Sequence, residues 1–140
     1  MSPRPRGFLD TDVLVYAFTS DRRAPTAQAL LEQDCVISVQ GLNEFANVAR
    51  QKLAMSWAEV GEALSAIRTL CPTIRPLDLE THLDALRLAE RYGYAIFDAL
   101  IIAAALRAGC DALFSEDLQD GMLIDGRLRI VDPFREFSAS

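Results

Sequence analysis

Near its start the chain runs Phe8-Leu9-Asp10-Thr11-Asp12-Val13-Leu14-Val15-Tyr16, an apolar pair, two aspartates two positions apart, and an apolar segment. This order predicts a buried strand over residues 7–10 that delivers a carboxylate at its C-terminal end. A short helix over residues 13–18 follows. Ligand and active sites of open α/β sheets lie at the carboxyl ends of the strands. Asp10 is therefore the first candidate site residue, and its partners are sought farther along the chain.

The rest of the chain alternates short apolar segments with amphipathic ones, which indicates strands alternating with helices. Further strands are predicted over residues 35–38, 74–77, 111–115 and 128–131. Helices are predicted over residues 24–33, 39–53, 57–70, 79–92 and 96–108. Ser56 and Glu59 form a capping-box pattern at the start of one of these helices. We expect a loop over residues 121–126 and a tail from residue 133. Regular alternation of this kind predicts an α/β fold with a parallel sheet between layers of helices.

Length and composition indicate a single domain with a real core, because the 140 residues are 51% hydrophobic. We expect residues 1–140 to form this domain, with residues 1–6 as a mobile lead-in and residues 136–140 as a tail. The longest apolar run, residues 99–106, has eight residues. A membrane span needs about 20. The start of the chain shows no secretory signal. We therefore expect no membrane segment and a cytoplasmic protein.

Charged and reactive residues exclude several classes of protein. The net charge of −6 argues against a protein that coats nucleic acid electrostatically. It does not exclude a nuclease, whose metal-binding carboxylates make a chain more acidic than its working surface. Cys35, Cys71 and Cys110 lie far apart without a CxxC pair, which predicts three buried thiols. His82 is the only histidine and is predicted to be structural or exposed, so histidine-based nucleophilic catalysis has little support.

Four carboxylates fall where predicted strands end or buried helices begin, namely Asp10, Glu44, Asp98 and Asp117. Each alone has a simpler explanation, such as a favourable interaction of Asp98 with a helix dipole. In a parallel sheet, however, all four positions lie at the same end, where like charges repel unless a cation neutralises them. Hard oxygen ligands without His or Cys select Mg²⁺ or Mn²⁺, and such ions support phosphodiester hydrolysis. The pattern predicts metal-dependent phosphodiester cleavage without a covalent enzyme intermediate.

Four segments of the chain, in this order and spacing, resemble the PIN-domain family. They are residues 8–16, 37–45, 97–105 and 113–121. The closest resemblance is to its VapC-type branch, the ribonuclease toxins of VapBC toxin–antitoxin pairs, and it covers about residues 7 to 135. It implies a three-layer α/β/α sandwich around a mostly parallel sheet. It also implies endonucleolytic cleavage of RNA (tRNA, rRNA or mRNA), a cognate antitoxin protein as partner, and a homodimer.

The resemblance also implies roles for individual residues. The family's metal-binding acids fall on Asp10, Glu44, Asp98 and Asp117, and Ser115 would support the site through its hydroxyl. Further support is expected from Asp12, Ser38, Asn43 and Asp120. Asp12 stands where the family commonly has Asn, so it either enlarges the metal site or raises the pKa of one carboxylate. Glu116 is expected to face solvent. Basic candidates for contacts with RNA are Arg22, Arg23, Arg50 and Lys52.

Two other interpretations stay open. Residues 10–12 also match the nucleophile and acid pair of haloacid-dehalogenase-type phosphatases, residues 36–38 resemble their second motif, and residues 115–120 could form their metal motif. That chemistry needs a lysine between the second and third motifs, and the only lysine, Lys52, lies close after the second. It also leaves Glu44 and Asp98 unexplained. The third interpretation is a PIN-fold module that binds a protein partner and has no catalytic activity.

Overall fold

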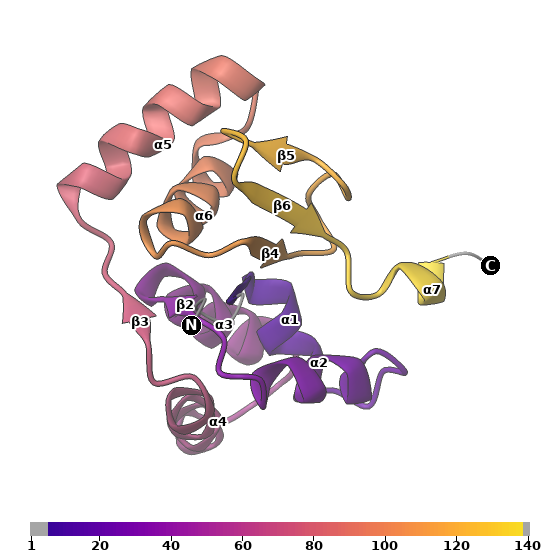
Figure 1. Ribbon diagram of the computed structural model, residues 1–140. Coiled ribbons are helices and arrows are strands. Elements are labelled where there is room, and N and C mark those ends of the chain that lie inside the picture. Colours follow the sequence, from indigo (N-terminus) through magenta and orange to yellow (C-terminus); the bar gives the residue numbers. More distant parts are fainter. Residues whose placement is uncertain (1–5, 139–140) are drawn as a thin grey trace.

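The computed structural model describes residues 6–138, which form six strands and seven helices (Figure 1). In chain order these are β1 (Gly7–Leu9), α1 (Thr11–Tyr16), α2 (Ala24–Leu31), β2 (Ile37–Ser38), α3 (Val39–Gln51), α4 (Trp57–Leu70), β3 (Ile74–Arg75), α5 (Leu79–Tyr92), α6 (Ile96–Arg107), β4 (Ala112–Phe114), β5 (Leu123–Ile124), β6 (Leu128–Val131) and α7 (Arg135–Ser138). Most of the predicted lead-in, residues 1–5, and residues 139–140 of the predicted tail lie outside this description. Arg6, the remaining lead-in residue, donates a hydrogen bond to the Thr73 hydroxyl at 2.9 Å.

The strands form a mostly parallel layer. Four strands follow the order β1-β4-β6-β5, and β2 pairs with β3. Every pair is parallel except β5 with β6. An isolated parallel bridge joins Phe8 to Val36, and the Leu9 N–H donates to the Val36 carbonyl at 3.0 Å. This bridge connects the small sheet to β1, so the layer runs β3-β2-β1-β4-β6-β5.

Helices cover both faces of this layer, which confirms the predicted three-layer sandwich. Figure 1 shows α5 and α6 on one side of β4 and helices α1 to α4 on the other. One cluster of buried apolar side chains lies under α5 and α6, and a second lies under α1 to α4. Helix α6 buries every side chain from Ala99 to Leu106, as expected of a helix that is apolar all round. Neither α6 nor another helix within residues 6–138 has both the length and the apolarity of a membrane span.

The predicted loop over residues 121–126 is wrong, because β5 lies inside it and forms a hairpin with β6. Asp125 and Gly126 at the turn have φ angles of 50° and 67°. The Arg127 N–H donates to the Ile124 carbonyl at 3.0 Å and closes the turn. A tight hairpin turn of this kind needs positive φ at both central residues, which is why Asp-Gly is a strong hairpin signal. The prediction overlooked that dipeptide.

The predicted tail from residue 133 contains a further element, α7. Phe134 just before it is fully buried, and its ring packs edge-on against Tyr16 with 5.0 Å between ring centroids. The Arg22 guanidinium donates to the Phe137 carbonyl at 2.8 Å. The end of the described chain is therefore anchored on α1 and on the loop before α2. Its apolar residues Phe134 and Phe137 supply the contacts that a polar tail lacks.

Candidate active site

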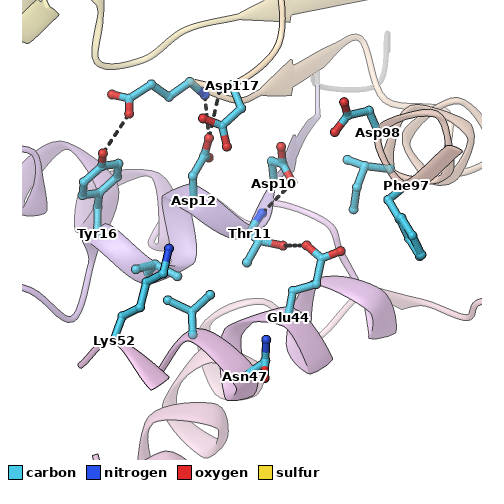
Figure 2. A pocket seen from close by; sticks show the side chains of 14 residues that line it. Asp10, Thr11, Asp12, Tyr16, Glu44, Asn47, Lys52, Phe97, Asp98 and Asp117 are labelled. Carbon is cyan, nitrogen blue, oxygen red and sulfur yellow. Dashed lines mark hydrogen bonds between the residues drawn. The ribbon is translucent and has the colours of Figure 1, made fainter. Parts of the chain in front are cut away.

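A cavity of about 490 Å³ lies where β1 and β4 end (Figure 2). Its volume is typical of ligand pockets, which measure roughly 300–1,000 Å³. Its acidic lining comes from four separate segments and consists of Asp10, Asp12, Glu44, Asp98, Glu116 and Asp117. The structure thus brings together the four acids that sequence spacing placed at one end of the sheet.

Asp10 follows β1 directly, and both of its carboxylate oxygens accept hydrogen bonds. Oδ1 accepts from the Thr11 N–H at 2.7 Å and caps α1, and Oδ2 accepts from the Ser115 hydroxyl at 2.8 Å. The residue is only 9% exposed. Burial raises its pKa to about 6, and the charges of Glu44 and Asp117 add to this although the two hydrogen bonds oppose it. Such a carboxylate is costly to ionise without a neighbouring cation.

Asp12 ties α1 to the loop after β4. Its Oδ2 accepts from the Glu116 N–H at 2.8 Å and the Asp117 N–H at 3.3 Å. Its Oδ1 is buried and has no hydrogen-bond partner among the described residues. Burial, followed by the charge of Asp10, raises the pKa of Asp12 to about 8. Of the two effects expected for this extra acid, the raised pKa is therefore present.

Glu44 is fixed by residues from two helices. The Thr11 hydroxyl of α1 donates to its Oε2 at 2.7 Å, and the Gln40 side-chain amide of α3 donates to its Oε1 at 2.9 Å. The same Gln40 amide donates to the Phe97 carbonyl at 3.2 Å, which links Glu44 to the start of α6. Gln40 and Thr11 were not among the predicted site residues. The four-residue spacing of Gln40 and Glu44 was the available signal, because such residues share a helix face.

Asp98 and Asp117 are the exposed acids of the cavity wall. Asp98 lies in the first turn of α6 and Asp117 lies in the loop after β4. Partial burial raises the pKa of Asp98, and the charges of Asp117 and Glu44 raise it further. Neither side chain makes a hydrogen bond or an ion pair within the described part of the chain, in contrast to Asp10 and Glu44. These two carboxylates are therefore free to turn.

Two polar residues were predicted to orient Glu44, and in the structure neither side chain forms a hydrogen bond with it. Ser38 caps α3, because its hydroxyl accepts from the Gly41 N–H at 3.0 Å, and it makes no hydrogen bond with Glu44. Asn43 is exposed and is not among the residues that line the cavity. Asn47, one turn farther along α3, lines the cavity instead. The residues of α3 that line the cavity besides Glu44 follow it at three and four positions, namely Asn47 and Val48, whereas Asn43 precedes it directly.

The loop after β4 carries two further acids whose predicted places need correction. Asp120 does not line the cavity, and its carboxylate accepts from a backbone N–H at 2.8 Å and from Arg135 at 3.0 Å. Glu116 was expected to face solvent, but it lines the cavity and is partly buried. It accepts from the Tyr16 hydroxyl and from Arg23 Nε, both at 2.8 Å. Glu116 is thereby neutralised by a cation, unlike Asp98 and Asp117.

Among the four basic candidates for RNA contacts, only Lys52 lines the cavity. Arg23 binds Glu116, and the Arg22 guanidinium donates to the Phe137 carbonyl in α7. Arg50 donates to the Met55 carbonyl at 3.0 Å and lies over the Trp57 ring, 4.6 Å from its centroid. Lys52 ends α3, and a cation is favoured there by the helix dipole. Its backbone N–H donates to the Val48 carbonyl at 2.7 Å, whereas its ammonium group makes no ion pair or hydrogen bond with another residue that the structure describes.

The donor chemistry of the cavity fits a hard divalent cation. Its acids offer only oxygen ligands, with no His or Cys, as Mg²⁺ and Mn²⁺ prefer. The buried, unpartnered Oδ1 of Asp12 and the raised pKa values of Asp10, Asp12 and Asp98 mark an excess of negative charge. As the side chains stand, however, no group of three or more acids, His or Cys within residues 6–138 could hold an ion. Binding therefore requires exposed acids such as Asp98 and Asp117 to turn.

Comparison with known proteins assigns the family. The sequence model of the PIN domain matches residues 7–119, so the chain belongs to the PIN-domain family. A comparison with curated proteins found no significant match.

Several solved structures share the fold. The Mycobacterium tuberculosis toxin VapC20, which cleaves the sarcin–ricin loop, is 20% identical with a TM-score of 0.65, over 79% of this chain and 91% of its own. A chain of a toxin–antitoxin complex from Klebsiella pneumoniae is 20% identical with a TM-score of 0.70, over 91% and 97%. A chain of VapBC2 from Rickettsia felis, bound to a promoter DNA fragment, is 19% identical with a TM-score of 0.64, over 90% and 98%. The fold is thus the PIN fold of VapC structures.

Proposed function

We propose that this protein is a metal-dependent endoribonuclease, the toxin of a type II toxin–antitoxin pair. The observation that carries the proposal is the convergence of Asp10, Glu44, Asp98 and Asp117 on one cavity. PIN-domain toxins are generally nucleases, and similar structures include a toxin that cleaves the sarcin–ricin loop and chains of toxin–antitoxin complexes. They support RNA as the substrate, whether tRNA, rRNA or mRNA, and an antitoxin as the partner.

Asp10, Glu44, Asp98 and Asp117 would hold Mg²⁺ or Mn²⁺. The bound ion supplies charge for the phosphate and the leaving oxygen and lowers the pKa of a water nucleophile. The chain prepares this site by fixing two acids and leaving two adjustable. Ser115 and the Thr11 N–H hold Asp10, while Asp98 and Asp117 carry no competing partner. Burial and the charge of Asp10 raise the pKa of Asp12 to about 8, while its Oδ2 accepts from two backbone N–H groups.

The assembly and the location follow from the same proposal. We propose that residues 1–140 act as one domain, that two copies form a homodimer, and that a cognate antitoxin holds the nuclease in check. Its place of action is the cytoplasm, where the proposed RNA substrates are made and used. A small DNA-binding protein encoded by the neighbouring reading frame would support the toxin role directly.

One observation supports the phosphatase interpretation, and the family assignment opposes it. Lys52 lines the same cavity as Asp10, which that chemistry would also need. The chain nevertheless belongs to the PIN-domain family, and the nuclease also accounts for Glu44 and Asp98, which the phosphatase leaves without a role. A phosphoryl group trapped on Asp10 would favour the phosphatase. A module without catalysis would bind metal and still fail to cut RNA.

The decisive experiment compares two site variants with one matched control. Asp10→Asn and Asp98→Asn should each lower RNA cleavage by at least about 100-fold, since each removes a proposed ion ligand. Asp120→Asn makes the same change of charge outside the cavity and should cut at the parent rate. Purified protein is incubated with tRNA and rRNA in Mg²⁺ or Mn²⁺, and the new RNA ends are sequenced. A site variant that cuts as fast as the parent would show that its residue has no such role.

Metal binding is measured separately by thermal melting. Adding Mn²⁺ should raise the Tm of the parent protein and of Asp120→Asn, because an ion that binds the folded state stabilises it. The shift should be smaller for Asp10→Asn and Asp98→Asn. Absence of any shift in the parent would count against a metal site in this cavity.

A further inference from the structure

A second cavity, of about 340 Å³, lies among α5, α6 and the turn of the β5–β6 hairpin (Figure 1). Its lining residues are Asp84 and Arg87 of α5, Leu106 and Arg107 of α6, and Arg127 next to β6. We call it the arginine cavity, because three guanidinium groups and, among the residues that the structure describes, a single carboxylate line it. The lining is therefore more basic than the chain as a whole, whose net charge is −6.

The arginine cavity lies at the end of the sheet away from the acidic cavity, and the two share no lining residue. Asp98 lies in the first turn of α6 and Arg107 ends that helix. Nine positions of an α-helix correspond to about 14 Å along its axis. Arg127 precedes β6, whose parallel partner β4 ends at the acidic cavity. The metal site proposed above therefore involves none of these arginines.

Arg127 combines a fixed backbone with a side chain that has no partner. Its N–H donates to the Ile124 carbonyl at 3.0 Å and closes the hairpin turn, and the next residue, Leu128, is fully buried. Arg127 is exposed, and its guanidinium makes no hydrogen bond or ion pair with another residue that the structure describes. It therefore presents a full positive charge and five N–H donors at the edge of the cavity.

The other two arginines are held by acids that leave part of each guanidinium unused. Arg107 donates to Asp84 at 3.0 Å and to Glu80 at 2.6 Å. Arg87 donates through Nη2 to Asp125 at 2.9 Å. The Nε of both arginines and the Nη1 of Arg87 have no partner among the described residues. Because these ion pairs restrict the two side chains, an anion that binds them costs less side-chain entropy.

Three guanidinium groups around one cavity favour a phosphate group over a carboxylate as the ligand. Paired N–H groups of arginine match the oxygens of either anion. A carboxylate, however, offers two oxygens and one charge, whereas a terminal phosphate offers three acceptor oxygens and nearly two charges. Asp84 is already bound to Arg107, so the donors of Arg87 and Arg127 stay available to a ligand.

We propose that the arginine cavity is a second ligand site, which binds a phosphate group between Arg87, Arg107 and Arg127. Two sources offer this chemistry, namely a free phosphate compound and the backbone of an RNA strand. The site goes beyond the proposed ribonuclease function, because no acid of the metal site takes part in it.

Titration calorimetry with inorganic phosphate tests the site, at neutral pH in EDTA and against sodium chloride of the same ionic strength. Arg127→Gln should weaken phosphate binding by at least about 10-fold, since it removes a charged hydrogen-bonding group. Arg127→Lys keeps the charge but loses the paired N–H groups, and its affinity should lie between those of the parent and Arg127→Gln. The matched control is Arg68→Gln, which removes an exposed arginine of α4 outside both cavities and should bind like the parent.

Amide NMR spectra of the parent locate the bound phosphate. Its addition should shift the backbone signals of Gly126, Arg127 and Leu128 and leave those of Thr11 and Asp12, at the acidic cavity, unchanged. Shifts at Thr11 and Asp12 alone would place the phosphate in the acidic cavity and overturn the proposal. Because the Arg127 side chain has no partner in the described structure, Arg127→Gln should keep the Tm of the parent.

RNA binding in EDTA distinguishes the two sources. If the RNA backbone is the ligand, Arg127→Gln should lower the slope of log affinity against log salt concentration by about 0.7 to 0.9, the value for one phosphate contact. If a free phosphate compound is the ligand, Arg127→Gln should bind RNA like the parent and lose only phosphate binding. Either result supports the site.

The proposal is wrong if Arg127→Gln changes neither phosphate nor RNA binding, or if Arg68→Gln loses as much affinity. It is also wrong if the parent binds neither phosphate nor RNA. The first two results leave the ribonuclease proposal intact, because RNA cleavage by Asp10→Asn and Asp98→Asn tests that proposal separately.

Discussion

The two carboxylate oxygens of Asp12 have opposite environments. Oδ2 accepts from two backbone N–H groups of the loop after β4, whereas Oδ1 is buried without a partner in the described structure. Burial and the nearby charge of Asp10 raise the pKa of Asp12 to about 8. An asparagine at this position would keep one acceptor oxygen for the loop and carry no charge.

We therefore expect Asp12→Asn to stabilise the metal-free protein at pH 8, raising its Tm by at least about 3 °C. The difference should be smaller at pH 5 and should vanish only below about pH 4, where Asp12 is protonated in the unfolded protein as well. RNA cleavage should stay within about 10-fold of the parent rate. Melting curves in EDTA at both pH values test the first two expectations. The control is Asp120→Asn, which removes an ion pair with Arg135 and should not raise the Tm. Loss of cleavage in Asp12→Asn would instead make Asp12 a direct ion ligand.

At the scale of single residues, the sequence predicted that four acids meet, but it missed Glu116 and did not show what holds them. Asp10, Glu44, Asp98 and Asp117 could be placed because each follows a predicted strand or opens a buried helix. Their partners depend on side-chain directions that spacing in the sequence specifies only within one helix. Gln40 was predictable from its spacing to Glu44. The Thr11 hydroxyl, 33 positions from Glu44, was not, because that contact exists only once α1 and α3 pack together.

At the scale of elements, the helices were more predictable than the short strands. Ser56 and Glu59 form the predicted capping box of α4, and Gly93 ends α5 with a φ of 77°. Local signals of this kind fix helix ends without tertiary contacts. Strands β2, β3 and β5 have two residues each, too few for a periodic pattern. Strand β5 exists because Asp125-Gly126 turns the chain back onto β6.

Helix α3 provides a prediction at this scale, because its N-cap supports the site from a distance. The Ser38 hydroxyl, 3% exposed, accepts from the Gly41 N–H and orders the turn that carries Gln40. Ser38→Ala should cost about 0.5–2 kcal/mol of stability and lower the Tm by about 2–8 °C. It should also reduce the Tm increase caused by Mn²⁺, since Gln40 orients Glu44.

The matched control for Ser38→Ala is Ser56→Ala at the N-cap of α4. Ser56 is exposed, its helix contributes no residue to the cavity lining, and its loss should lower the Tm without changing the response to Mn²⁺. Equal losses of the Mn²⁺ response in both variants would mean that general destabilisation, and not the orientation of Glu44, produces the effect.

At the scale of the whole molecule, the acids whose pKa is shifted fall into two groups with opposite directions. Outside the cavity, hydrogen bonds lower the pKa values of Asp21, Asp78 and Asp125. Inside it, burial and like charges raise those of Asp10, Asp12 and Asp98. The two apolar clusters on either side of the sheet hold the second group together against its own repulsion. The fold thus stabilises a concentration of negative charge that an ion would relieve.

This division predicts how stability changes with pH. A carboxyl group with a raised pKa binds more protons in the folded state than in the unfolded one, so stability falls as the pH rises between the two pKa values. That interval extends from about pH 4 to about pH 6 for Asp10, and from about pH 4 to about pH 8 for Asp12. The acids with lowered pKa values make stability depend on pH only below about pH 4. In EDTA, the Tm should therefore fall by at least about 3 °C between pH 5 and pH 8.

Mn²⁺ should reverse this dependence on pH. Because an ion binds the ionised carboxylates, it should raise the Tm more at pH 8 than at pH 5, and the two melting temperatures should converge or cross. The double variant Asp10→Asn/Asp12→Asn serves as the control, since it lacks both strongly shifted groups and should melt at nearly the same temperature across this interval in EDTA. A parent protein whose Tm in EDTA is constant or rises from pH 5 to pH 8 would show that these acids are not held together against their repulsion. The charge that the proposed metal site requires would then be absent from the folded molecule.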